Sequence, residues 1–91
     1  MDEIHKLIDE IINMQKELFY SIKPIVINII KSRSKDTIII EKYLDILLNM
    51  NIEEAHELFF VLCDYYSTFD KESSEFYLNE YKEIYEDEII K

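Results

Sequence analysis

The stretch IHKLIDEIINMQKELFYSI, residues 4–22, decides the fold class. Its apolar residues recur every three or four positions, and most of its charged residues fall between them. This spacing matches the period of an α-helix, so it predicts one apolar stripe and one solvated stripe. The apolar stripe consists of Ile4, Leu7, Ile8, Ile11, Met14, Leu18 and Ile22.

Pro24 follows this predicted helix and leaves two arrangements open. The proline either opens a second helix at its first turn or kinks one continuous helix, because its ring removes a backbone donor and crowds the preceding turn. The next run, residues 25–30, is rich in β-branched residues and could form a strand by propensity. We expect a helix there, since a single strand would have no partner for its backbone groups.

The basic, polar segment 31–35 predicts a loop. Asp36 has the position and side chain of an N-cap, which predicts a helix from Thr37 to about Met50. The predicted inner face of this helix consists of Ile39, Tyr43, Ile46, Leu47 and Met50.

Two more helices are predicted after Met50. Asn51 with Glu54 approximates a capping box that starts a helix from Ile52 to about Tyr66, with Leu58, Phe59, Leu62 and Tyr66 pointing inward. Residues 67–70 supply a turn and a cap before a final helix to the C-terminus. One side of that helix carries Tyr77, Tyr81, Ile84 and Tyr85, and the other carries Glu72, Glu75, Glu83 and Glu86. We therefore expect an all-α protein, a small single-domain bundle of four or five helices over residues 1–91.

The composition removes several enzyme classes. The chain contains no glycine, whereas P-loops, dinucleotide-binding loops and nucleophile elbows all need glycine to turn tightly or to approach phosphate. Cys63 is the single cysteine, and its neighbour Asp64 would disfavour a thiolate. We expect no enzyme, no catalytic residues and no cofactor.

Two acid–histidine pairs have the spacing of a metal-binding helix, Glu53-x-x-His56 and Asp2-x-x-His5. Residues three apart share a helix face, so each pair could hold one ion. A di-iron bundle needs two further inward carboxylates, however, and chance pairs are frequent in a chain with twenty Asp and Glu. We expect no metal site and expect both histidines at the surface or its boundary.

The chain has features of a cytoplasmic protein. Its acidic start, Met1-Asp2-Glu3, is unlike a secretory signal, and a single cysteine fits a reducing compartment. The apolar runs are too short to cross a bilayer, so we expect no membrane partner. The basic segment 31–35 could contact phosphate in a helix-turn-helix arrangement, but a net charge of −10 disfavours direct binding to nucleic acid.

Acid and aromatic residues concentrate in the second half of the chain. Residues 51–91 contain twelve Asp and Glu against three Lys, and nine of the twelve aromatic residues. A negative field beside large rings suits a basic protein partner, because the field attracts the partner and the rings offer packing. The predicted partner-binding residues are Glu72, Glu75, Glu83, Glu86, Asp87, Tyr77, Tyr81 and Tyr85.

The sequence thus predicts a non-enzymatic polyanion mimic that inhibits or neutralises a basic partner such as a nuclease, a toxin or another nucleic-acid-acting effector, as anti-defence, antitoxin or immunity proteins do. A simpler interpretation is that the acidic surface only keeps the protein soluble. The alternative function is a structural or oligomerisation module, in which apolar faces of residues 24–50 pack against another copy or another helix.

Overall fold

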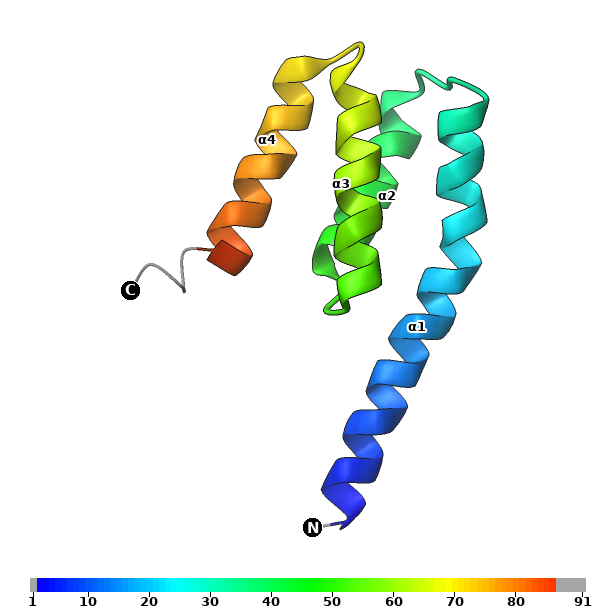
Figure 1. Ribbon diagram of the computed structural model, residues 1–91, viewed down its shortest axis with the longest axis vertical. Coiled ribbons are helices and arrows are strands. Elements are labelled where there is room, and N and C mark those ends of the chain that lie inside the picture. The colour runs from blue at the N-terminus through cyan, green and yellow to red at the C-terminus, as the bar shows by residue number, and fades with distance from the viewer. Residues whose placement is uncertain (1, 87–91) are drawn as a thin grey trace.

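The computed structural model describes residues 2–86, which form an all-helical single domain (Figure 1). Four α-helices follow one another: α1 (Asp2–Lys31), α2 (Thr37–Asn49), α3 (Glu53–Ser67) and α4 (Lys71–Tyr81). A single π-helical turn, η1 (Lys82–Glu86), extends α4. The predicted fold class and helix number are confirmed.

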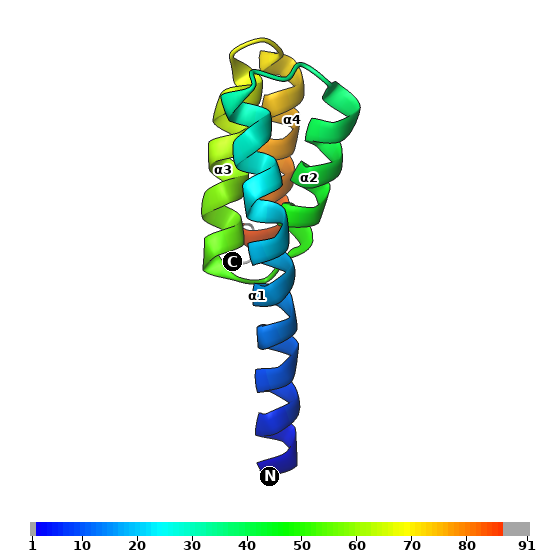
Figure 2. The same ribbon diagram turned by 90° about the vertical axis from the view of Figure 1, so that its right-hand side faces the viewer.

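Helix α1 runs without a break through Pro24, so the proline does not separate two helices. The run 25–30 is helical, as expected. The helix bends along its length, and its N-terminal half extends beyond the end of the other helices (Figures 1 and 2). The molecule is therefore a short bundle from which one helix projects.

Side-chain caps start α2 and α4 as the sequence predicted. The Asp36 carboxylate accepts a hydrogen bond from the backbone N–H of Ile39 over 3.3 Å, and Asp70 accepts one from Ser73 over 3.1 Å. The capping box predicted at Asn51 is wrong, because the N-cap of α3 is Ile52 and makes no side-chain cap bond. The backbone N–H of Asn51 instead donates to Oε1 of Gln15 on α1 over 2.9 Å.

Helix α3 is the central helix, because it packs against α1, α2 and α4. All four inward positions predicted for α3 are buried. The prediction for α2 is partly wrong: Leu47 and Met50 are buried, but Ile39 is 42% exposed and Ile40 lies in the core in its place. The buried residues of α2 are Ile40, Leu44, Leu47 and Leu48.

Helix α4 is fixed to α3 by a buried polar contact. Ser74 is 1% exposed, and its hydroxyl donates to the Cys63 carbonyl oxygen over 2.7 Å. This bond satisfies the hydroxyl within the core. Tyr77 lies one turn further along and is also buried. The inner face of α4 is therefore built from Ser74 and Tyr77.

Candidate functional site: a projecting apolar arm and an acidic helix

The largest departure from the sequence prediction concerns the apolar stripe of residues 4–22. Only Ile22 of that stripe is buried, at 6% exposure. We call residues 4–14 the arm, because the contact between Gln15 and Asn51 marks the point where α1 reaches the bundle. The arm carries six large apolar side chains that are between 39% and 68% exposed: Ile4, Leu7, Ile8, Ile11, Ile12 and Met14.

The bare stripe of the arm continues the face with which α1 packs on its own bundle. The buried residues of α1 are Phe19, Ile22, Val26 and Ile29. Ile4 lies eighteen residues before Ile22, about five helical turns, so the two side chains leave α1 in the same direction. One face of α1 is thus covered in its C-terminal half and uncovered in its N-terminal half.

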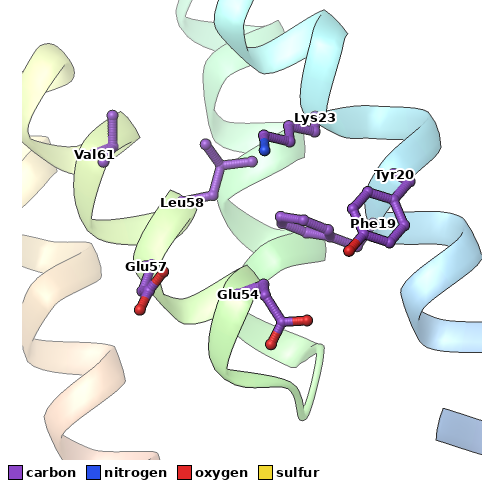
Figure 3. A pocket seen from close by; sticks show the side chains of 7 residues that line it. All are labelled: Phe19, Tyr20, Lys23, Glu54, Glu57, Leu58 and Val61. Atoms are coloured by element: carbon purple, nitrogen blue, oxygen red, sulfur yellow. The ribbon is translucent and has the colours of Figure 1, made fainter.

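A hollow lies between α1 and α3 where the arm joins the bundle (Figure 3). Its volume is about 250 Å³, and Phe19, Leu58 and Val61 line it together with Tyr20. Three charged side chains also line it: Lys23, Glu54 and Glu57. Lys23 extends from α1 toward α3, above Leu58 in this view. The hollow adds apolar surface next to the arm.

The structure places three of the predicted acidic site residues on the surface. Glu72 and Glu75 on α4 and Glu83 in η1 are exposed. Asp87 and the side chain of Glu86 lie outside the described residues. The glutamates that can be placed are therefore available to a partner.

The predicted tyrosines are packed within the fold. Tyr77 is 7% exposed, and burial together with the carboxylates of Asp45 and Glu41 raises its pKa well above the ordinary value. The Tyr85 hydroxyl donates to the Leu48 carbonyl oxygen over 2.6 Å. Burial raises the pKa of Tyr85 as well.

Tyr81 is half-buried at the centre of an aromatic cluster. Its ring is stacked on Phe59 at 5.7 Å and lies edge-on to Phe60 at 4.7 Å. His56 and Tyr85 complete the cluster, with a ring separation of 4.5 Å from each other. The three predicted tyrosines thus hold α4 and η1 against α2 and α3, and their rings offer a partner little surface.

Phe76 is the aromatic residue of α4 that faces outward, at 58% exposure. It lies four residues after Glu72 and one after Glu75, on the exposed side of the helix. The predicted site lacked Phe76 because the regular spacing of Tyr77, Tyr81 and Tyr85 indicated a binding face on another side of α4. The four-residue spacing between Glu72 and Phe76 places both on one side of the helix and could have identified Phe76 from the sequence.

The groups weighed for catalysis are engaged in the fold. Cys63 is buried, and burial raises the pKa of its thiol to about 12, so the nucleophilic thiolate is scarce at neutral pH. His56 Nε2 lies 2.8 Å from the Met50 carbonyl oxygen. Within residues 2–86, no three histidine, cysteine or acidic side chains gather closely enough to hold a metal ion.

Lys31 of the basic segment ends α1, and residues 32–36 form the turn to α2. Arg33 adopts a left-handed backbone with a φ of 54°, and Tyr65 of α3 donates its hydroxyl to the Ser34 carbonyl oxygen over 2.6 Å. This turn is thereby fastened to α3.

Comparison with known proteins gives no relative from which a function could be carried over: no family model, no curated protein and no solved structure matches the chain. Among the helices described here, none is both long and apolar enough to cross a membrane.

Proposed function

We propose that this protein is a non-enzymatic protein-binding module whose main binding surface is the apolar stripe of the arm. The observation that carries the proposal is the exposure of six large apolar side chains in one stripe of a projecting helix. Monomeric soluble proteins rarely expose a contiguous apolar patch of this kind unless it is an interaction site. This exposure places the assembly surface at residues 4–14, whereas the sequence alone suggested residues 24–50.

The stripe is large enough to support association. Fully burying a large aliphatic side chain contributes about 1.5–3 kcal/mol, so covering the exposed half of six contributes roughly 5–10 kcal/mol. This range is comparable to the lower part of the cost of associating two molecules, which is about 4–15 kcal/mol. The arm alone therefore supports only weak association, and apolar surface contributed by the partner or contacts at the hollow would strengthen it.

The arm also has a reason to need a partner for its own stability. Most helices in proteins owe their stability to packing of an apolar face, and the large apolar side chains of the arm are 39–68% exposed. A partner that covers the stripe would supply the packing that most protein helices depend on. We expect the encounter in the cytoplasm, where the buried free thiol of Cys63 is compatible with a reducing environment.

The test is affinity capture from the source cells with three tagged proteins: the natural chain, Ile11→Glu in the arm, and Ile38→Glu as the matched control. Ile38 is 81% exposed on α2, so the control introduces the same charge outside the arm. Loss of a specific protein only with Ile11→Glu supports the proposal. Recovery of the same proteins with both variants contradicts it.

A second candidate function is inhibition of a basic protein partner by the acidic side of α4, which the exposed Phe76 among Glu72, Glu75 and Glu83 favours. The glutamates would pair with Lys or Arg of a nuclease, toxin or similar effector, and Phe76 would supply the apolar centre of the contact. The mechanism would be occlusion of the basic site.

Salt and charge variants separate this candidate from the first. Acid-driven binding should weaken steeply as salt rises from about 0.05 M to about 0.5 M, whereas binding through the arm should change little. Glu72→Gln, Glu75→Gln and Glu83→Gln together should abolish acid-driven capture. The matched control is Glu3→Gln, Glu10→Gln and Glu17→Gln on α1, which removes the same charge from a different helix. If both triple variants capture the partner equally well, the second candidate function is wrong.

A further inference from the structure

We propose that the partner of the arm is a second copy of this chain, and that two arms pack side by side in antiparallel orientation. The inference rests on the proposed function and specifies its partner. In this dimer each arm covers the apolar stripe of the other, and the two bundles lie at opposite ends of the assembly. The tip of one arm, near Ile4, meets the base of the other, near Met14.

The position of the bundle determines the orientation. The bundle packs on the face of α1 that carries Ile22, and the bare stripe continues that face along the arm. Two arms packed in parallel through this face would bring both bundles into the same space. Antiparallel arms avoid that conflict, because the second arm runs through the open space beyond the end of α2 and α3 (Figures 1 and 2).

The contact between Gln15 and Asn51 limits the overlap to residues 4–14, since the turn between α2 and α3 begins there. Within this stretch an antiparallel pair brings Ile4 opposite Met14 and Leu7 opposite Ile11. Each of these opposed pairs forms a layer of two apolar side chains. Both copies contribute the same residues to the contact, as a two-fold dimer requires. The spacings along each helix, three, four and three residues, are those of paired helices.

The area suffices for a specific contact. Six half-exposed apolar side chains from each copy remove on the order of 1,000 Å² of surface in total, which is about the minimum for a biological interface. The hollow beside Phe19 and Val61 lies further along α1 than this overlap and adds nothing to the area. We therefore expect a dimer that dissociates on dilution.

Charge favours this arrangement over other contacts between copies. The whole chain carries a net charge of −10, to which the arm contributes only through Lys6, Asp9 and Glu10. The least charged end of each copy therefore forms the contact. The eleven residues of the arm separate the two acidic bundles by about 16 Å of helix. This separation exceeds the screening length of about 8 Å at physiological salt.

Sedimentation equilibrium over a range of concentrations tests the association itself. The natural chain and Ile38→Glu should shift from monomer to dimer as concentration rises, and Ile11→Glu should remain monomeric at concentrations at least tenfold higher. Circular dichroism checks that Ile11→Glu is folded, and we expect it to be, because Ile11 is 55% exposed in the monomer. A natural chain that stays monomeric throughout overturns the proposal, as does a dimer unaffected by Ile11→Glu.

Disulfide trapping tests the orientation. Ile4→Cys and Met14→Cys are made as separate proteins, and the buried Cys63 provides a common background. An equal mixture should give a disulfide-linked heterodimer upon mild oxidation, and each variant alone should give several-fold less. Parallel arms would instead link each variant efficiently with itself and would give no excess of heterodimer in the mixture. That result overturns the proposal.

The outcomes separate this inference from the proposed function. A monomeric chain whose Ile11→Glu variant loses a captured protein disproves the dimer and leaves the arm as the binding surface for a different protein. A monomeric chain whose variant loses nothing disproves both.

Discussion

Ile4 and Ile22 leave the same continuous helix in the same direction, yet Ile22 is 6% exposed and Ile4 is 62% exposed. The difference is due to what lies opposite each residue, because α3 and α2 end before the arm begins. The chemistry of the two positions is identical. Their roles therefore differ only through packing.

Substitution of these two isoleucines by alanine should have very different effects on the monomer. Ile22→Ala creates a cavity between α1 and the bundle and should lower the free energy of unfolding by about 2–5 kcal/mol. Ile4→Ala should change it by no more than about 0.5 kcal/mol at high dilution, because no core contact is lost. Urea unfolding followed by circular dichroism measures both. Equal losses would show that the arm is packed in the monomer.

Tyr66 makes a polar contact inside the core that should be costly to remove. It is fully buried, and its hydroxyl donates to Oε2 of Glu41 over 2.6 Å. Tyr66→Phe should lower the free energy of unfolding by about 1–3 kcal/mol, since the Glu41 carboxylate loses a donor. Tyr20→Phe is the control, because Tyr20 is 60% exposed. A loss of stability no greater than that of the control would show that water replaces the donor freely.

Alkaline pH should destabilise the fold through the same residue and through Cys63. Burial and the hydrogen bond to Glu41 raise the pKa of Tyr66 from 10.0 to about 12, and burial raises that of Cys63 from 9.0 to about 12. Folding thus favours the protonated forms, so their contribution to stability is complete below pH 9.0 and is lost as pH rises toward about 12. Urea unfolding at successive pH values tests this. A free energy of unfolding that stays level over that window would contradict it.

Arg33 occupies a backbone conformation that suits glycine better. Its φ of 54° lies in the left-handed region, in the turn that ends α1. The chain contains no glycine to place there, and a side chain in this conformation costs roughly 1 kcal/mol. Arg33→Gly should raise the free energy of unfolding by about that amount. Arg33→Ala is the control for loss of the guanidinium and should not stabilise the protein.

The sequence predicted the positions of the helices better than it predicted which of their faces are buried. Periodicity identified the inner face of α3 and the caps at Asp36 and Asp70, because these depend on local spacing. It misplaced the core position at Ile39, since three consecutive isoleucines, Ile38 to Ile40, offer the same chemistry at three angles. The capping box predicted at Asn51 is wrong for a different reason. The backbone N–H of Asn51 donates a hydrogen bond to Gln15, which is distant in the sequence.

The two candidate surfaces show the same limit. A stripe of apolar residues at helical spacing predicts that something covers it, but the spacing does not say whether the cover comes from the same chain. The stripe 4–22 is covered at Ile22 and bare at Ile4 for this reason. The opposite holds for Tyr77, Tyr81 and Tyr85. Their rings were predicted to bind a partner, but they pack within the fold and hold α4 and η1 in place.

Amide hydrogen exchange of the arm at low and high protein concentration tests the central claim most directly. Residues 4–14 should exchange rapidly in dilute solution and become protected as concentration rises, while residues 22–30 should be equally protected in both because the bundle covers them. Exchange in the arm that is independent of concentration would contradict the account of a stripe covered by a second copy.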